Sequence, residues 1–442
     1  MKKTVLLIST MIFGAFATVQ AQVVDDELEI TVTNDEGEKE VIDLPEGMTM
    51  ELDSLLGAYN GQTYLKPNPN CDQPDVNPVY DKEVYKDRLS RIPSVIELPY
   101  NDVVQKFIDR YSGRLRRSVA IMLGTQNFYI PLFEEALEAY NLPLELKYLP
   151  VIESALNPNA VSRAGAAGLW QFMISTGKQY GLEVNSLVDE RRDPVAASYA
   201  AAHYLSDLYG IFGDWNLVIA AYNCGPENIN KAIHRSKGET DYWKIYPYLP
   251  RETRGYVPAF IAANYIMNYY SEHNICPMVA SLPIKTDTVV VNRDIHFEQL
   301  ANVLDISVSQ LHELNPQYRR NIVNGSSKPS VLRLPNTMTG TFIDREEDVY
   351  AYNAEALLSR RTEVEVNDAV PATTYTRSRS SRSSSRSRKS RRSSRGGKSV
   401  TIRQGDTLSQ IAARNGTTVS KLRKLNNISG SSIRAGKKIR IK

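Results

Sequence analysis

The sequence predicts a mainly α-helical domain that is followed by small βααβ modules. Three observations predict this: helix-capping signals recur through the middle of the chain, strand-like alternation is scarce there, and an apolar spacing near the C-terminus also occurs earlier. The chain has 442 residues, enough for two or three domains. Its 42% hydrophobic and 23% charged residues are ordinary for a globular protein.

The first 21 residues are typical of a cleavable export signal. Lys2 and Lys3 precede a short apolar run over residues 5–17, and residues 19–21 (VQA) place small side chains where a signal peptidase cuts. We therefore expect an exported protein of the periplasm or cell envelope. An N-terminal membrane anchor is the alternative, but the apolar run is short for a membrane span.

The cysteine and histidine content predicts neither a disulfide scaffold nor a metal site. Cys71, Cys224 and Cys276 allow at most one internal disulfide and leave one thiol over, and the sequence leaves the pairing open. Neither their spacing nor the five His residues form a metal-ligand pattern. We expect no metal and no other cofactor.

Basic residues are concentrated at the C-terminal end. Residues 377–398 hold ten Lys or Arg and no acid, and residues 399–442 hold ten more against Asp406 alone. The Arg/Ser-rich part predicts a flexible linker, because like charges repel and nothing there can form a core. Such a tail indicates an anionic partner. Nucleic acid is the usual one, but export favours envelope polymers, so we expect no nucleic-acid partner.

The middle of the chain carries the helix signals. Residues 22–84 are acidic and rich in Pro and Asn, and we expect them to be partly disordered, whereas residues 85–278 are dense in apolar residues. Asp193 and Asp214 are the predicted N-caps of two helices, and Pro258 predicts a bend in a third. The predicted helices run over residues 194–208, 215–222 and 251–270.

The last 44 residues predict a compact βααβ unit, with strands near residues 400–402 and 437–442 and helices near 406–415 and 419–425. A shift of 111 residues repeats its apolar spacing and predicts a first copy over residues 283–337, with a linker over 338–398. Chance is the alternative explanation. The matched positions are Phe297, Leu300, Ala301, Val308, Ser309, Leu311, Leu314 and Asn315 with Leu408, Ile411, Ala412, Val419, Ser420, Leu422, Leu425 and Asn426.

Glu153 is the candidate catalytic acid. It follows Leu149, Val151 and Ile152, and a carboxyl held against apolar groups has a raised pKa, as a general acid near neutral pH requires. No Asp or Glu occurs from residue 154 to residue 182. The alternative is an ordinary surface glutamate.

Aromatic and amide side chains follow it in three further segments. Trp170 and Gln171, Tyr222 and Asn223, and then Tyr256 offer ring faces and hydrogen-bonding groups of the kind that hold a sugar polymer. Taken singly, Trp170 and Tyr222 are explained equally well as core residues.

Together these segments resemble the soluble-lytic-transglycosylase family, whose marks are Glu-Ser, Gly-Leu-x-Gln, Ala-Tyr-Asn-x-Gly and a Tyr in the last helix. They stand here at residues 153–154, 168–171, 221–225 and Tyr256. The resemblance covers about residues 85–275 and implies a lysozyme-like helical fold. The Trp in the second motif, an Asn-Pro pair after the first and the lead-in to the last helix resemble the membrane-bound D branch. That branch often carries a lipid anchor, whose Cys is missing here, so peripheral membrane or envelope association stays open.

The resemblance also implies a reaction on peptidoglycan glycan strands. One glutamate, Glu153, would cleave the β-1,4 bond between N-acetylmuramic acid and N-acetylglucosamine and leave a 1,6-anhydromuramoyl end. The residues that it implies to contact substrate or orient the acid are Ser154, Gln171, Tyr222, Asn223 and Tyr256.

Residues 399–442 resemble a LysM module, through the segments GDTL, IA and LNN that begin at residues 405, 411 and 425. This resemblance implies binding of polymers that contain N-acetylglucosamine. The first copy has Asp-Ile-His at residues 294–296 in place of Gly-Asp-Thr, so it is LysM-like and its glycan binding stays open.

Two other functions compete with transglycosylation. A hydrolytic lysozyme-type muramidase predicts a second carboxylate close to Glu153 in space, such as Glu183 or Glu252. A non-catalytic wall-binding scaffold predicts a lost acid, whereas Glu153 is present.

Overall fold

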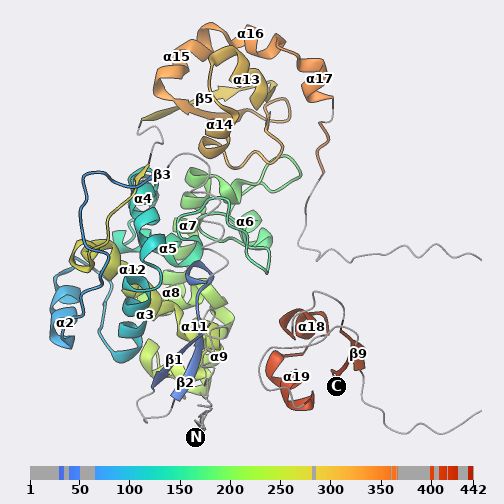
Figure 1. Cartoon of the computed structure of the whole chain (residues 1–442). Helices are drawn as coiled ribbons and strands as arrows, with labels where there is room; N and C mark the ends of the chain where they lie inside the picture. The colour runs from blue at the N-terminus through green and yellow to red at the C-terminus, as the bar shows by residue number, and fades with distance from the viewer. Residues whose placement is uncertain are drawn as a thin grey trace, which may run out of the picture. The chain divides into compact units, whose positions relative to one another are not determined.

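A computed structural model of the chain divides into two compact units, residues 1–370 and 371–442 (Figure 1). The predicted export signal, the Arg/Ser-rich segment and the Gly-Asp-Thr motif lie outside the described residues. None of the helices in the part that the structure describes is both long and apolar enough to span a membrane. The described residues are 29–33, 39–49, 65–280, 285–359, 361–364, 366, 399–402, 408–415, 417–426 and 437–441.

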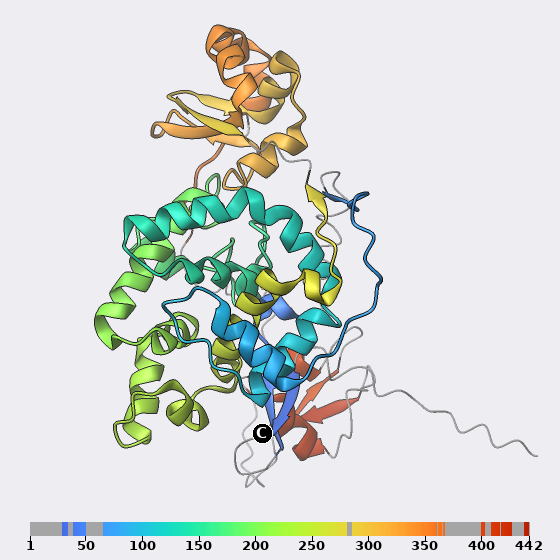
Figure 2. The ribbon, with the colours of Figure 1, turned by 90° about the vertical axis from the view of Figure 1, so that its left-hand side faces the viewer.

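A helical domain occupies residues 82–269 of the first unit (Figure 2). Its central helix is α12, which is buried along nearly its whole length and packs against α3, α4, α5 and α8. The helices are α2 (Lys82–Arg91), α3 (Asp102–Ser112), α4 (Arg116–Ala139), α5 (Leu149–Ser154), α6 (Ile174–Gln179), α7 (Pro194–Phe212), α8 (Trp215–Cys224), α9 (Pro226–Arg235), α10 (Tyr242–Ile245), α11 (Arg251–Arg254) and α12 (Tyr256–Tyr269).

Side-chain caps begin two of these helices as predicted. The Asp193 carboxylate accepts the backbone N–H groups of Val195 and Ala196 at the start of α7, and the Asp214 carboxylate accepts that of Leu217 at the start of α8. Each cap satisfies N–H groups that the first turn of a helix leaves without partners. The predicted starts of both helices are confirmed.

The third predicted helix breaks at a different residue. The sequence predicts a bend at Pro258, but the structure ends α11 before Gly255 and begins α12 after it. Pro258 is the third residue of α12, where a missing N–H costs no intrahelical bond. A Cβ on Gly255 would lie 2.9 Å from the Asp43 carbonyl and 3.1 Å from Phe107, so close packing selects glycine there.

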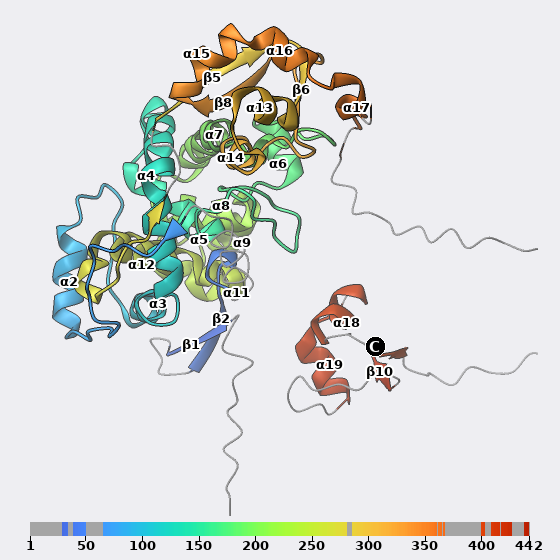
Figure 3. The ribbon, with the colours of Figure 1, turned by 45° about the horizontal axis from the view of Figure 1, so that its top comes forward.

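A hairpin precedes the helical domain, in a region that the acidic composition predicts to be partly disordered. Strands β1 (Glu29–Thr33) and β2 (Lys39–Asp43) pair antiparallel, with Val32 and Ile42 buried. They contact α3 and α11 (Figure 3). Ion pairs with α11 offset the acidic charge, because Glu40 pairs with Arg254. A 3₁₀ turn, η1 (Glu46–Met48), follows.

A disulfide between Cys71 and Cys276 decides the pairing that the sequence leaves open, and Cys224 keeps its thiol. It lies beside a short sheet in which β3 (Leu65–Lys66) pairs with β4 (Val279–Ala280). The bond therefore ties the segment before α2 to the segment that follows α12.

The first module, residues 285–351, follows the helical domain. Antiparallel pairs β5–β8 and β6–β7 enclose α13 and α14. The linker predicted from residue 338 onward begins later, because α15 and α16 bury Phe342, Val349 and Tyr350 in the core of this module. Its elements are β5 (Thr286–Val291), β6 (Asp294–His296), α13 (Phe297–Leu304), α14 (Val308–Leu314), β7 (Ile322–Asn324), β8 (Ser330–Pro335), α15 (Asn336–Asp344) and α16 (Glu346–Ala351), and α17 (Ala354–Leu358) follows them.

The second module, residues 399–442, has the predicted βααβ order: β9 (Ser399–Thr401), α18 (Leu408–Arg414), α19 (Val419–Asn426) and β10 (Lys438–Arg440). One polar lock occurs in both modules. The Asn315 side chain exchanges two hydrogen bonds with the backbone of Arg333, and the Asn426 side chain does so with that of Arg440. The internal repeat is therefore confirmed in three dimensions.

Candidate active site

Glu153 lies in the last turn of α5, between the buried residues Ile152 and Ser154. Its own side chain is half-buried. The chain reverses immediately afterwards, because Ala155 and Leu156 both adopt left-handed conformations with φ of 48° and 60°. A short helix that ends in this turn holds the carboxyl at the boundary between apolar core and solvent.

Tyr256, the first residue of α12, contacts this carboxyl directly. Its buried phenol donates a hydrogen bond to Glu153 Oε1. Burial and the nearby Glu153 carboxyl raise the pKa of Tyr256 well above its usual value, so the phenol keeps its proton. Tyr256 can therefore orient Glu153 and stabilise its ionised form.

Burial also changes the acidity of Glu153. Loss of hydration, together with the smaller effect of the neighbouring carboxylates Glu46 and Glu252, raises its pKa to about 8, although the Tyr256 hydrogen bond acts in the opposite direction. The group is consequently protonated at neutral pH and can give a proton to a leaving oxygen.

Of the two candidates for a second carboxylate, Glu183 and Glu252, the structure places one near Glu153. Glu252, from α11, interacts electrostatically with Glu153, as a hydrolase would require. Glu183, the other candidate, forms an ion pair with Lys328 of the first module instead. Glu46 from η1 is a further neighbour that sequence reasoning missed, since no local pattern links it to residue 153.

Ser154 is a tether. Its hydroxyl is fully buried and lies 3.1 Å from the Pro150 carbonyl and 2.9 Å from the Leu169 carbonyl. It thus joins α5 to the Gly168–Gln171 motif, whereas the sequence predicted a substrate contact. A buried hydroxyl whose neighbours are protein carbonyls has no free face for a sugar.

The Gly168–Gln171 motif is held in place by close contacts with other protein groups. A Cβ on Gly168 would lie 1.7 Å from the Arg191 carbonyl, so only glycine fits. Trp170 is fully buried and donates from Nε1 to Ser198 Oγ at 2.9 Å, which makes it a core residue. Gln171 is half-buried and donates from Nε2 to the Gly168 carbonyl at 2.7 Å.

Helix α8 contributes Tyr222 and Asn223, both half-buried. The Tyr222 hydroxyl donates to the Trp170 carbonyl at 2.8 Å, and Asn223 Oδ1 accepts from Thr253 Oγ1 at 2.9 Å. Burial raises the pKa of Tyr222, and the nearby Glu153 carboxyl raises this pKa as well, by a smaller amount. Of the predicted residues outside α5, Tyr222 and Tyr256 thus interact with the Glu153 carboxyl, whereas Gln171 and Asn223 bond to other protein groups.

Family models match three parts of the chain. A transglycosylase SLT domain matches residues 131–245, which include Glu153 and the α8 motif. Residues 131–245 are thus similar to SLT transglycosylase domains. The LysM-like domain of lytic transglycosylase MltD matches residues 285–351, and a LysM domain matches residues 400–442.

The chain is similar to membrane-bound lytic murein transglycosylase D of Escherichia coli (strain K12), with 31% identity over 305 residues, 68% of this chain and 60% of that protein. It thus spans about three fifths of the length of that relative. It is 32% identical to the soluble lytic murein transglycosylase of the same strain over 27% of this chain and 19% of that protein. A crystal structure of the 70 kDa soluble lytic transglycosylase of Escherichia coli matches with 28% identity and a TM-score of 0.29, over 33% of this chain and 25% of that one.

Proposed function

We propose that this protein is a peptidoglycan lytic transglycosylase that uses Glu153 as its single acid and base. The observation that carries the proposal is the Glu153 carboxyl, protonated at neutral pH and hydrogen-bonded to Tyr256, inside an SLT domain. The relatives are named as lytic murein transglycosylases, which supports peptidoglycan strands as the substrate.

In the proposed reaction, Glu153 gives its proton to the glycosidic oxygen as the bond from C1 of N-acetylmuramic acid breaks. The resulting carboxylate takes the proton of the C6 hydroxyl of the same sugar, while that oxygen closes onto C1. No water is consumed and Glu153 ends protonated. Because the attacking hydroxyl belongs to the substrate, its effective concentration is high. The Tyr256 phenol supports the transient carboxylate.

A hydrolytic muramidase is the second candidate, and Glu252 is the observation that favours it. An ionised Glu252 near Glu153 has the chemistry to activate a water for attack on C1. The two reactions differ in the origin of the oxygen at C1 of the new chain end, which is substrate oxygen in one case and solvent oxygen in the other.

Heavy-oxygen water separates the two reactions. We expect muropeptides released at early times to carry no solvent oxygen at C1 and to be one water lighter than reducing ends, as measured by mass spectrometry. Heavy oxygen in the primary product would make the enzyme a hydrolase. In the same assay Glu153→Gln should lower the rate about a hundred- to ten-thousand-fold, with an unchanged thermal unfolding midpoint as its control. Near-normal release by Glu153→Gln would remove Glu153 from the mechanism.

The cellular setting belongs to the same proposal. We propose export to the periplasm or envelope, where peptidoglycan lies, and binding of N-acetylglucosamine-containing strands by the second module. The LysM match over residues 400–442 supports the second point, and the first rests on the N-terminal sequence. Fractionation of cells that express the full chain tests the location, and a sedimentation assay with purified sacculi tests the binding.

A further inference from the structure

The η1 turn, far from Glu153 in sequence, is packed directly against the helix that carries it. A Cβ on Gly47 would lie 2.4 Å from the Ile152 carbonyl and 2.9 Å from the Val151 carbonyl. Backbone therefore meets backbone at the last turn of α5, and glycine is required by the close approach. Gly47 and Met48 are buried there, whereas the Glu46 side chain is exposed.

Glu46 is held from the loop that follows Glu153. The Ser162 hydroxyl and the Arg163 backbone N–H both donate hydrogen bonds to its carboxylate. These bonds and the positive charge of Arg163 favour the ionised form of Glu46. Partial loss of hydration and the nearby Glu252 carboxylate raise the Glu46 pKa. The carboxylate thus has a fixed position and still reaches solvent beside the reacting group.

The segment that carries Glu46 is anchored on both sides of η1. Before the turn, Asp43 pairs with Arg251 at 3.6 Å, and Arg251 Nε donates to the Val41 carbonyl at 3.0 Å. At its end, the Met48 carbonyl lies 3.5 Å from an Arg110 nitrogen. These contacts hold the turn to α11, which carries Glu252, and to α3, while Gly47 packs it against α5, which carries Glu153.

We propose that Glu46 is a substrate-contacting residue, whose carboxylate accepts hydrogen bonds from a sugar hydroxyl or N-acetyl N–H next to the bond that Glu153 cleaves. An exposed, pre-positioned carboxylate is the acceptor that such donors need. The N-terminal segment, outside the SLT match at residues 131–245, then completes the glycan site. This inference rests on the proposed action on peptidoglycan glycans.

The test compares Glu46→Gln with Glu138→Gln, which makes the same charge change on an exposed residue near the end of α4. Loss of a hydrogen bond to a charged acceptor should raise KM for soluble glycan strands about tenfold or more, with a smaller change in kcat. The control should leave KM unchanged. Equal unfolding midpoints show that both variants fold.

The pH profile gives a second readout. Glu153 is faced by Tyr256 from α12, Tyr222 from α8, Glu252 from α11 and Glu46 from η1. Activity should fall as pH rises and Glu153 loses its proton. Removing the Glu46 charge makes that loss easier, so Glu46→Gln should move the alkaline limb to lower pH. Glu46→Asp keeps the charge and shortens the reach, so it should restore the limb but not KM.

Binding measured without turnover separates this inference from the reaction itself. In a Glu153→Gln background, adding Glu46→Gln should weaken binding of a soluble glycan strand about tenfold or more in a calorimetric titration. That result would support the contact even if the heavy-oxygen assay showed hydrolysis. The inference would be overturned if Glu46→Gln had the same KM and the same alkaline limb as Glu138→Gln, and if adding Glu46→Gln to the Glu153→Gln protein left its glycan affinity unchanged.

Discussion

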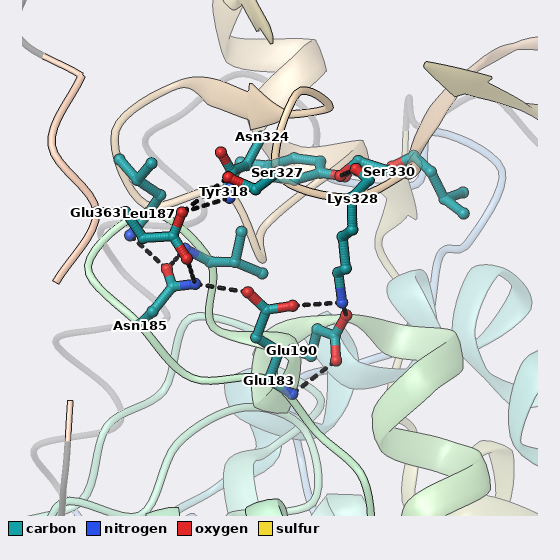
Figure 4. A network of polar contacts seen from close by, with 12 residues as sticks. Glu183, Asn185, Leu187, Glu190, Tyr318, Asn324, Ser327, Lys328, Ser330 and Glu363 are labelled. Atoms are coloured by element: carbon teal, nitrogen blue, oxygen red, sulfur yellow. Dashed lines mark hydrogen bonds and ion pairs between the residues drawn. The ribbon is translucent and has the colours of Figure 1, made fainter. Parts of the chain in front are cut away.

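The first and second modules share one fold and one asparagine lock, yet they belong to different compact units. The first module is bound to the helical domain by a polar network: Lys328 pairs with Glu183 and with Glu190 at 3.1 Å (Figure 4). The second forms a core from its own residues, with Ile411, Leu422 and Ile439 fully or almost fully buried, in a separate unit. The comparison teaches that one βααβ fold can pack against another domain or form a compact unit with its own core.

Backbone contacts make the first module continuous with the loop at residues 183–190. The Asp189 N–H donates to the Gln317 carbonyl at 2.9 Å, and the Arg319 N–H donates to the Leu187 carbonyl at 2.8 Å. These backbone groups of the first module therefore bond to the helical domain and are not available to a ligand.

A strap of residues 361–364 reinforces this junction (Figure 4). The Glu363 carboxylate accepts hydrogen bonds from Asn185 of the loop and from Asn324 and Ser327 of the module. One side chain thus fastens the module to the loop.

The loop passes this support on to the candidate site. Asp189 forms a buried ion pair with Arg191 at 2.8 Å. The Arg191 guanidinium in turn donates to the carbonyls of Gly165 and Phe172, which flank the motif that contains Gln171. The first module is therefore linked to the candidate site through Asp189 and Arg191.

Of the changes that test this difference between the modules, Arg191→Ala should have the largest effect on stability and activity. The change removes the closer partner of the buried Asp189 carboxylate and leaves it with Arg192 at 3.9 Å, at a cost of up to about 3–5 kcal/mol. We expect a lower unfolding midpoint for the first unit and loss of most glycan cleavage. Arg91→Ala, which breaks an exposed pair with Asp87 on α2, should cost less than about 1 kcal/mol. Equal losses in the two variants would disprove the support role of Arg191.

The asparagine locks allow a matched test of intermediate size. Asn315→Ala and Asn426→Ala remove the same bonds from the two modules, and each should cost about 1–3 kcal/mol. Hydrogen exchange should speed up in residues 183–190 as well as the first module after Asn315→Ala. After Asn426→Ala it should change within residues 399–442 alone. An Asn315→Ala protein with normal protection of the loop would show that the modules are equally independent.

Removing residues 377–442 should have the smallest effect on catalysis. A tethered binder raises the local substrate concentration without entering the active site. We expect unchanged cleavage of short soluble glycans and weaker sedimentation with sacculi. Loss of short-glycan cleavage in the truncated protein would make the second module part of the active site.

Local sequence signals predicted what is local in the structure. The Asp193 and Asp214 caps and the apolar setting of Glu153 depend on neighbours within a few residues, so sequence spacing is sufficient to find them. The repeat was found in the same way, because each copy keeps its own local apolar spacing. The break at Gly255 depends on the close approach of the Asp43 carbonyl, which no spacing reveals.

Chemical type alone did not reveal which polar residues face solvent. Ser154 has a suitable group for a sugar, but its hydroxyl tethers two segments inside the core. Glu46 has no motif around it, and it joins Glu153 only because Gly47 lets two backbones meet. Such residues depend on tertiary packing, which a single sequence leaves undetermined.

The unpaired thiol has a consequence for the integrity of the covalent structure. Thiolates, and not thiols, attack disulfides, and burial raises the pKa of Cys224 to about 11. At pH 7 roughly one Cys224 in ten thousand is therefore ionised. The odd cysteine is a slow nucleophile, so the Cys71–Cys276 bond can persist in oxidising surroundings without being exchanged by the Cys224 thiol.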